Sequence, residues 1–294
     1  MIGGGPLMGS ARTHGYRLER RLSHADVDFL GELKVPALLG LLEQAAVEAS
    51  SAVGFDAARY TREGRIWIIR RTRLQRLVPV GGGDIVEVET GVADFRRARS
   101  LRRYAVRREG TLVAEATTDW VYCDLQSGRP VRIPEALQRA FMGGDPGTPL
   151  PRAAPLPSHG CGAPVAVTLT VQPSHLDHVA HVNNTVYAAY LEDGAFALFA
   201  ACGWPLPRML AMGGALRIQW LDAEYHHDAG AGEELSVNSW LFEDVTVERD
   251  CDRPPARARV LQTIHRGGGE EVTRAQSEWV WRRRPDVVGG VPCP

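Results

Sequence analysis

Two segments of the chain carry apolar residues at the three- and four-residue spacing of a helix that packs on a core. The residues at this spacing are Leu38, Leu41, Leu42 and Ala45 in the first segment and Val186, Tyr190, Phe196 and Phe199 in the second. Pro36 suits the first turn of a helix, while Gly54 and Gly203 suit the left-handed residue that ends one. The pattern therefore predicts one long helix within residues 28–55 and another within residues 177–204.

Other segments alternate apolar and polar residues with a period of two. Residues 85–89, 235–241 and 257–264 do so, which predicts half-buried antiparallel strands. A helix that is apolar on most of its surface needs cover from several sides, and a curved antiparallel sheet supplies it. We expect each half to be one helix wrapped by a sheet. Two such sheets would join edge to edge, because the junction hides two exposed strand edges.

The two helical segments belong to an internal repeat. Residues 28–55 align without a gap on residues 177–204, and 177 − 28 and 204 − 55 both give an offset of 149. Asp28 falls on Asp177, and Gly54 on Gly203. The signals that follow keep the same order: residues 73–77 match 217–221, the glycine turn 81–84 matches 230–233, and the tryptophan strand 118–122 matches 277–281. The chain therefore contains two copies of one unit.

The region between the copies is so dense in proline and glycine that neither helix nor strand should persist through it. The 294 residues of the chain suffice for two ordinary domains, each with a buried core. We therefore expect an α+β fold with an N-terminal domain over residues 16–142, a linker over residues 143–164 and a C-terminal domain over residues 165–283.

Composition limits the class of protein. A net charge of −1, with 44% hydrophobic and 23% charged residues, indicates a soluble globular protein with no overall attraction to nucleic acid or membrane. Five scattered cysteines without a Cys-x-x-Cys pair argue against a disulfide framework and a zinc ribbon, and favour a reducing compartment. The first residues lack the apolar core of a secretory signal, and no segment reaches the roughly 18 apolar residues of a membrane span. We expect a cytoplasmic protein.

The motif His-Val-Asn-Asn-Thr-Val-Tyr-Ala-Ala-Tyr-Leu-Glu at residues 181–192, with residues 65–134 of the first copy, resembles the plant and bacterial acyl-acyl-carrier-protein (acyl-ACP) thioesterases. The resemblance covers residues 16–283. It implies a double hotdog, that is, two fused domains with a central helix wrapped by an antiparallel sheet. It also implies hydrolysis of fatty acyl-ACP to free fatty acid and holo-ACP in fatty acid biosynthesis. The motif also occurs in single-domain acyl-CoA thioesterases. The resemblance of the first half is therefore what favours acyl carrier protein over CoA as the carrier.

The resemblance implies one partner, the acyl carrier protein, with no cofactor, no metal and no nucleic acid, and it leaves room for a homodimer. The basic run of Arg96, Arg97, Arg99, Arg102 and Arg103, with Arg107 and Arg108, would attract an acidic carrier protein or the phosphate of phosphopantetheine. A solvated strand face explains the same run equally well. His175, His178 and His181, and the run of residues 226–228, resemble metal clusters, but the family's loop needs no metal.

Thioester hydrolysis needs a nucleophile or a base that activates water, and hydrogen-bond donors where the carbonyl oxygen gains charge. The resemblance implies that Asp177 attacks the carbonyl or activates water, and that His181 orients the reactants and passes a proton to the leaving thiol. Asn183 joins this set, although an asparagine beside a helix start is commonly a cap. The unpaired N–H groups of the helix start could hold the thioester oxygen.

Two departures from the family pattern affect the site. Val179 stands where the plant enzymes have an asparagine, and residues 221–225 stand where they have a Glu-Cys pair. Glu224 either takes the role of that glutamate or is a solvated strand end. The residues expected to contact substrate are Asn184, Val179, Tyr187 and Glu192. In the first copy Glu32 and Lys34 replace the histidine and asparagine, so we expect one site per chain.

Three other functions remain open. An acyl-CoA thioesterase would run the same chemistry, a catalytically silent acyl-binding protein would fit the two departures, and a hotdog dehydratase would need a histidine facing an acidic partner on the other domain. The length and type of the acyl chain depend on packing that the sequence does not reveal.

Overall fold

The computed structural model describes residues 15–142, 153–242 and 254–284. The N-terminal half contains β1 (Tyr16–Arg21), η1 (His24–Asp26), α1 (Val35–Ala52), α2 (Ala57–Arg62), β2 (Arg65–Arg76), β3 (Ile85–Arg96), β4 (Arg99–Arg108), β5 (Thr111–Asp124) and α3 (Glu135–Met142). The C-terminal half contains β6 (Val165–Thr170), η2 (Pro173–His175), α4 (Asn184–Ala201), α5 (Leu206–Ala211), β7 (Gly214–Tyr225), β8 (Glu234–Leu241), β9 (Arg257–Arg266) and β10 (Glu270–Arg283).

The strands form one antiparallel sheet with the order β1-β3-β4-β5-β2-β7-β10-β9-β8-β6. The first five strands in this order come from the N-terminal half and the last five from the C-terminal half. β2 pairs with β7 from Arg71 opposite Glu224 to Gln75 opposite Trp220. The two sheets are therefore joined edge to edge, as the burial of strand edges predicts.

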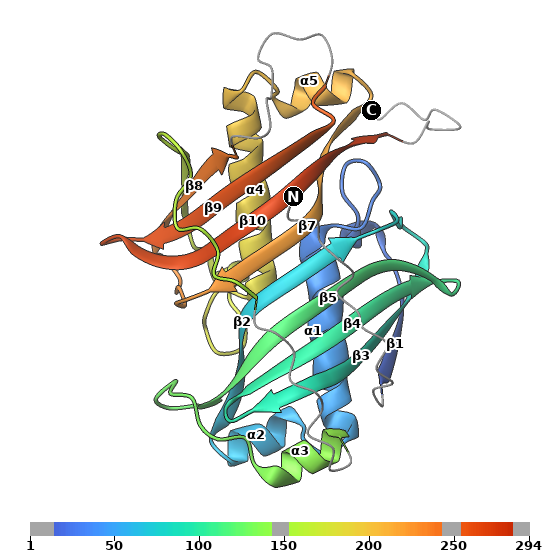
Figure 1. Ribbon diagram of the computed structural model, residues 1–294, viewed down its shortest axis with the longest axis vertical. Helices are drawn as coiled ribbons and strands as arrows, with labels where there is room; N and C mark the ends of the chain where they lie inside the picture. Colours follow the sequence, from blue (N-terminus) through green and yellow to red (C-terminus); the bar gives the residue numbers. More distant parts are fainter. Residues whose placement is uncertain (1–14, 143–152, 243–253, 285–294) are drawn as a thin grey trace.

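Both long helices lie behind the sheet in the view of Figure 1, with α2 and α5 at opposite ends of the molecule. α1 and α4 contact each other as well as the strands. Leu38, Leu41 and Leu42 of α1 are buried in the main hydrophobic core, which α4 shares. Gly54 and Gly203 have φ angles of 83° and 87° just after the helices, where only glycine adopts the backbone without strain. The predicted helices are thus confirmed.

The repeat is more regular in space than the sequence suggests. β1 and β6, α1 and α4, α2 and α5, β2 and β7, and β3 and β8 begin 149 residues apart, as their first residues show. The alignment of residues 73–77 on 217–221 was wrong by five residues: β2 begins at Arg65 and β7 at Gly214, so Arg73 corresponds to Asp222. Similar apolar spacing along two strands permits such a slip, whereas the bulges at Arg70 and Gln219 define the register.

The part of the linker that the structure describes, residues 153–164, contains neither helix nor strand. Residues 143–152 lie outside the described residues. The described segment is tied to the sheet, because Arg71 donates to the Ala154 carbonyl oxygen at 2.9 Å and Arg274 to that of Leu156 at 3.0 Å. Figure 1 shows it as the yellow-green trace on the face of the sheet away from α1 and α4.

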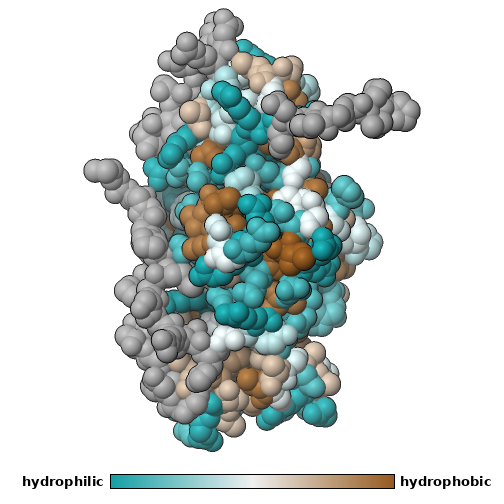
Figure 2. All heavy atoms as spheres, turned by 90° about the vertical axis from the view of Figure 1, so that its right-hand side faces the viewer, coloured by the Kyte–Doolittle hydropathy of each residue, from teal (hydrophilic) through white to brown (hydrophobic). Residues whose placement is uncertain are grey.

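The outer surface carries both polar and apolar side chains. Figure 2 shows one side of the molecule, where separate apolar patches lie at mid-height among polar side chains. Large apolar side chains that are exposed on the described part of the chain include Phe29, Ile68 and Ile85. No helix of the described residues is both long and apolar enough to cross a membrane.

Candidate active site

The loop before α4 holds Asp177 in a fixed conformation. Oδ1 of Asp177 accepts hydrogen bonds from the backbone N–H groups of Val179 at 2.9 Å and His181 at 3.2 Å. The Asp177 N–H donates to the His181 carbonyl oxygen at 2.8 Å, which closes the loop. Within the described residues both hydrogen bonds to this carboxylate go to Oδ1, so Oδ2 is available to water or substrate. Ala180 has a φ of 62°, a left-handed conformation that costs a residue with a Cβ free energy.

Asn183 joins this loop to α4 and to the other half of the molecule. As the N-cap of α4, its Oδ1 accepts from the Thr185 N–H at 2.8 Å, so the expected cap is confirmed. The Asn183 side chain also hydrogen-bonds to the carboxyl group of Glu43, which lies on α1. Burial of Glu43 and the charge of Asp177 raise the pKa of this carboxyl, while Asn183 and the charge of His178 lower it to a smaller degree. The site is therefore built by both halves.

His181 is held by a carboxylate other than Asp177. Its Nε2 lies 2.8 Å from Oδ2 of Asp228, and both side chains are about half exposed. Asp228 belongs to the turn after β7, which is attached to the active-site loop because the Val182 N–H donates to the Ala229 carbonyl oxygen at 2.9 Å. This contact orients the imidazole.

Tyr187 lies on the first turn of α4 and is 3% exposed. Its hydroxyl finds no hydrogen-bond partner in the described residues, which is costly for a buried polar group. Burial, with the nearby charge of Asp228, raises the pKa of this phenol above its usual range. The hydroxyl therefore stays protonated and can donate a hydrogen bond to a ligand.

The equivalent loop before α1 has the same backbone but is closed by ion pairs. The Asp28 N–H donates to the Glu32 carbonyl oxygen at 2.8 Å, and Asp28 Oδ1 accepts from the Leu30 N–H at 2.7 Å. Arg217 Nη2 lies 2.7 Å from Oδ2 of Asp28 and 3.3 Å from Oε1 of Glu192. Five buried charged side chains make up this cluster: Asp28, Glu32, Arg76, Glu192 and Arg217. The first copy of the loop therefore offers no open carboxylate.

The structure separates two of the expected site residues from Asp177. Glu192 belongs to the closed cluster around Arg217. Glu224 lies on the other face of the sheet, because Leu221, Ala223 and Tyr225 alternate with it and pack in the core beneath the helices. Of the other residues expected to contact substrate, Asn184 is the first residue of α4, and Val179 contributes its backbone N–H to Asp177.

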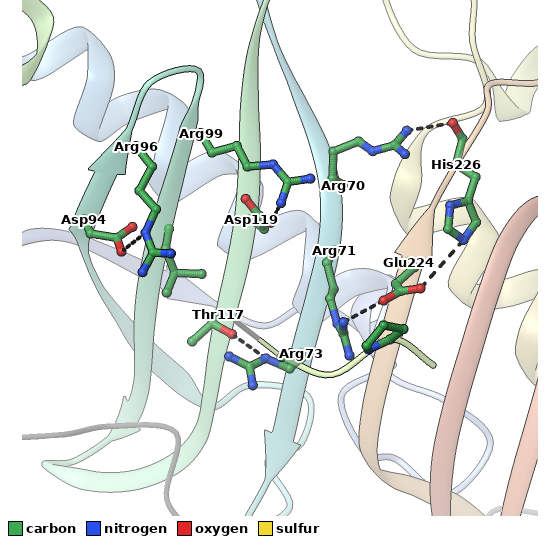
Figure 3. A pocket seen from close by; sticks show the side chains of 13 residues that line it. Arg70, Arg71, Arg73, Asp94, Arg96, Arg99, Thr117, Asp119, Glu224 and His226 are labelled. Carbon is green, nitrogen blue, oxygen red and sulfur yellow. Dashed lines mark hydrogen bonds and ion pairs between the residues drawn. The ribbon is translucent and has the colours of Figure 1, made fainter. Parts of the chain in front are cut away.

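Glu224 lines a cavity of about 270 Å³ on the face of the sheet that the linker crosses. Arg71 lies 2.6 Å from Glu224, and Figure 3 shows His226 pointing toward the same carboxylate. Several arginines line the pocket, and carboxylates offset part of their positive charge. Arg96, for example, pairs with Asp94. No residue of the 177–184 loop lines it.

Most arginines of the basic run on β3 and β4 are also paired with carboxylates or buried. Asp119, Glu89 and Asp84 pair with Arg99, Arg107 and Arg108 respectively. Arg102 is buried, with its guanidinium 5.2 Å from the centre of the Phe141 ring. In the part of the chain that the structure describes, no group of three or more His, Cys, Asp or Glu side chains is placed to hold a metal ion.

Two site residues have no sequence signal of their own. Glu43 sits in an apolar helix of the other half, and Asp228 sits in a predicted turn. The repeat could have indicated Glu43, because it aligns with Glu192, the glutamate that ends the recognised motif. Nothing local distinguishes Asp228, whose contact with His181 forms only when the turn packs on the loop.

A helix wrapped by five antiparallel strands, repeated once and joined through β2 and β7, defines the protein as a double hotdog. A protein from Lactobacillus plantarum described as an oleoyl thioesterase matches with a TM-score of 0.77 at 16% identity, covering 94% of this chain and 99% of that one. Residues 14–141 match the family model of the acyl-ACP thioesterase N-terminal domain. The resemblance to the acyl-ACP thioesterases recognised from the sequence is thereby confirmed over the N-terminal half, and the whole chain shares its fold with solved thioesterases.

Two further structures share the fold. The 12:0-ACP thioesterase from Umbellularia californica has a TM-score of 0.69 at 20% identity, covering 91% of this chain and 94% of that one. An acyl-ACP thioesterase from Bacteroides thetaiotaomicron has a TM-score of 0.67 at 22% identity, covering 91% and 98%. No curated protein sequence matches significantly. At these identities the likeness establishes the fold, so substrate and mechanism must be argued from the site.

Proposed function

We propose that the protein hydrolyses the thioester of a fatty acyl group carried on acyl carrier protein, at a single site centred on Asp177 and His181. The observation that carries this proposal is the difference between the two equivalent loops. One is closed by Arg217, whereas the other keeps an oriented Asp177 carboxylate and a His181 imidazole that is held by Asp228. The N-terminal half supports the carrier-protein substrate, because its match is to the acyl-ACP thioesterase domain.

In this mechanism Asp177 removes a proton from water through Oδ2, and the resulting hydroxide adds to the thioester carbonyl carbon. Oδ1 stays bonded to two backbone N–H groups, which fixes the carboxylate for this step. The Tyr187 hydroxyl is a donor available to the substrate carbonyl oxygen. The intermediate collapses with cleavage of the C–S bond, and His181, aligned by Asp228, donates a proton to the departing thiolate. Asp177 then releases its proton to solvent and His181 takes one up from solvent, which restores both groups for the next turnover.

The first test replaces Asp177 with asparagine and measures thiol release from a panel of acyl-ACP substrates. D177N keeps acceptors for the loop N–H groups but removes the base, so we expect kcat to fall about 10²–10⁴-fold with the fold intact. The matched control is D28N, which removes the equivalent carboxylate from the closed cluster. D28N should lose stability and keep most of its turnover. Full activity in D177N would rule out the proposed site.

The carrier is tested on the same preparation with matched acyl-ACP and acyl-CoA substrates. A higher kcat/KM on acyl-ACP supports the proposal, whereas a preference for acyl-CoA would assign the same chemistry to the other carrier. Tight acyl binding by the wild type without any thiol release would instead indicate an acyl-binding protein.

A further inference from the structure

The face of the sheet opposite the long helices carries a cavity that the proposed reaction does not use. Its volume is about 270 Å³, and no residue of the Asp177 loop lines it. The arginines in its lining are Arg70, Arg71, Arg73, Arg96 and Arg99. Figure 3 shows that they come from β2 and from the ends of β3 and β4. Strands that lie apart in the sequence therefore bring five guanidinium groups to one cavity.

Three of the five arginines are paired with carboxylates: Arg71 with Asp222 and Glu224, Arg96 with Asp94, and Arg99 with Asp119. In the described part of the chain, Arg70 and Arg73 have no such pair and bond only to neutral oxygens. Arg70 Nη1 donates to the His226 carbonyl oxygen at 2.6 Å, and Arg73 Nε donates to Thr117 Oγ1 at 3.2 Å. The other N–H groups of these two guanidiniums are available to a ligand.

A β-bulge brings Arg70 to this cavity. Neighbouring residues of a regular strand point to opposite faces of the sheet, so Arg70 and Arg71 would not both line one cavity. The pairing of β2 with β5 skips Arg70, since Ile69 lies opposite Trp120 and Arg71 lies opposite Asp119. A bulge of this kind redirects a side chain. Here it places consecutive arginines in the same cavity lining.

The other half of the molecule keeps the bulge but not the arginines. The repeat offset of 149 places Gln219, Trp220 and Asp222 of β7 where β2 has its three arginines. The bulge recurs at Gln219, so the two strands share their backbone. Since the same strand forms without these arginines, the fold does not require them. Their presence in one half therefore indicates a local binding role.

The two arginines without a carboxylate are held close to other positive charges. Burial lowers the pKa of Arg70, and the charge of Arg99 lowers it further. Burial also lowers the pKa of Arg73, where Asp222 acts in the opposite direction and the charge of Arg71 adds to the lowering. An anion in the cavity would offset this repulsion and replace the water lost by both guanidiniums.

We propose that this cavity binds a small phosphate-bearing molecule through the guanidinium groups of Arg70 and Arg73. A guanidinium presents several N–H groups in a plane, which suits the oxygens of a phosphate. A phosphate monoester carries a charge of about −1.5 to −2 at pH 7, which matches two arginines that lack a carboxylate. The site is separate from the Asp177 site, so the proposal does not depend on thioester hydrolysis.

The linker favours a small ligand over the surface of a carrier protein. Ala153 and Pro155 of the linker form part of the cavity lining, and Arg71 holds the segment between them through the Ala154 carbonyl oxygen at 2.9 Å. The anion would therefore lie between the sheet and the linker. Pockets for drug-sized ligands span about 300–1,000 Å³, so a cavity of about 270 Å³ suits a molecule of smaller size.

The test measures binding to the full chain by isothermal titration calorimetry in a phosphate-free buffer. The probes are inorganic phosphate, pyrophosphate and the monoester glycerol 3-phosphate. We expect binding at one site per chain, with the affinity reduced about 10–100-fold in R73M and in R70M. R73K, which keeps the charge but loses the planar fork, should bind with intermediate affinity. The control R17M removes an arginine that is 65% exposed at the sheet edge, and should bind as the wild type does.

The comparison of probes identifies the source of the phosphate. Tighter binding of glycerol 3-phosphate than of inorganic phosphate would support a phosphate that is part of a larger molecule, whereas the reverse order would support free phosphate. Failure of the wild type to bind any of the three probes, or equal affinities in R73M, R70M and wild type, would overturn the proposal. Loss of holo-ACP binding in these variants, with binding of the probes unchanged, would also overturn it and would assign the arginines to the carrier protein.

Discussion

At the scale of single residues, the proposed function depends on a few differences between two loops with the same backbone. Both loops close with the same N–H to carbonyl bond, and both need a left-handed residue, which is Gly31 in one and Ala180 in the other. The first loop is sealed by Arg217 and Glu192, whereas in the second the equivalent of Arg217 is Ile68. The closed cluster and the open loop thus differ at Arg217, whose counterpart is Ile68, and at Glu32, whose counterpart is His181.

The partly buried carboxyl of Glu43 should also make folding stability depend on pH. Its pKa in the folded state is raised above the ordinary value of 4.5, so the folded protein disfavours the ionised form. Stability from this group is full below the unfolded pKa, near 4.5, and is lost as the pH rises through the folded pKa. We therefore expect the free energy of unfolding of E43Q, relative to wild type, to increase as the pH rises above about 4.5.

Urea unfolding of both proteins at several pH values measures this difference. A difference between E43Q and wild type that stays constant from acid to alkaline pH would show that Glu43 ionises equally well in the folded and unfolded states.

At the scale of elements, the two long helices match residue for residue but approach the sheet differently. Gly194 of α4 faces the sheet, where an added Cβ would lie 2.6 Å from Val237 Cγ1 and 3.0 Å from Gln262 Nε2. Gln262 donates to the Leu191 carbonyl oxygen at 2.8 Å and so occupies the space between helix and sheet. The equivalent residue of α1 is Ala45, so glycine here permits a closer approach of α4.

The substitution G194A should therefore destabilise the protein by about 1–3 kcal/mol, because the Val237 and Gln262 side chains that the added Cβ would meet are fully buried. The matched control is G40A in α1, where an added Cβ meets nothing within 4 Å and the equivalent residue of α4 is Ala189. G40A should stabilise the protein by about 0.5–1 kcal/mol, through better helix propensity. Equal effects of the two substitutions in chemical denaturation would contradict this account.

At the scale of the whole molecule, the seam between β2 and β7 unites the halves. Arg71 crosses it with two parallel hydrogen bonds of 2.7 Å to the carboxylate of Asp222 and one of 2.6 Å to Glu224. The three side chains are 6–15% exposed. The same guanidinium holds the linker through the Ala154 carbonyl oxygen. One arginine therefore connects both sheets and the chain that links them.

Replacing Arg71 with methionine should lower the free energy of unfolding by about 3–5 kcal/mol, because two buried carboxylates lose their shared cation. The double variant R71M/D222N should recover part of this loss. The control R17M removes an arginine that is 65% exposed and paired with Glu87 and Glu89, and should change stability by less than about 1 kcal/mol. A similar loss in both single variants would show that the seam is no stronger than a surface ion pair.

The sequence by itself determined the features that depend on residues close to one another along the chain. Apolar periodicity located both helices, the 149-residue repeat revealed two copies of one unit, and the motif at residues 181–192 located the loop of Asp177, His181 and Asn183. These features depend on backbone geometry over one or two turns, so a local pattern is enough to specify them.

Only the tertiary structure decided which residues meet across the molecule. It paired His181 with Asp228, brought Glu43 to Asn183, and separated Glu192 and Glu224 from Asp177. A glutamate on a helix or a strand has the same local pattern whether it faces a catalytic loop, an arginine or the opposite face of the sheet. Strand register and the packing of the two halves determine which partner each side chain contacts. Both bring together residues that are more than a hundred positions apart in the sequence.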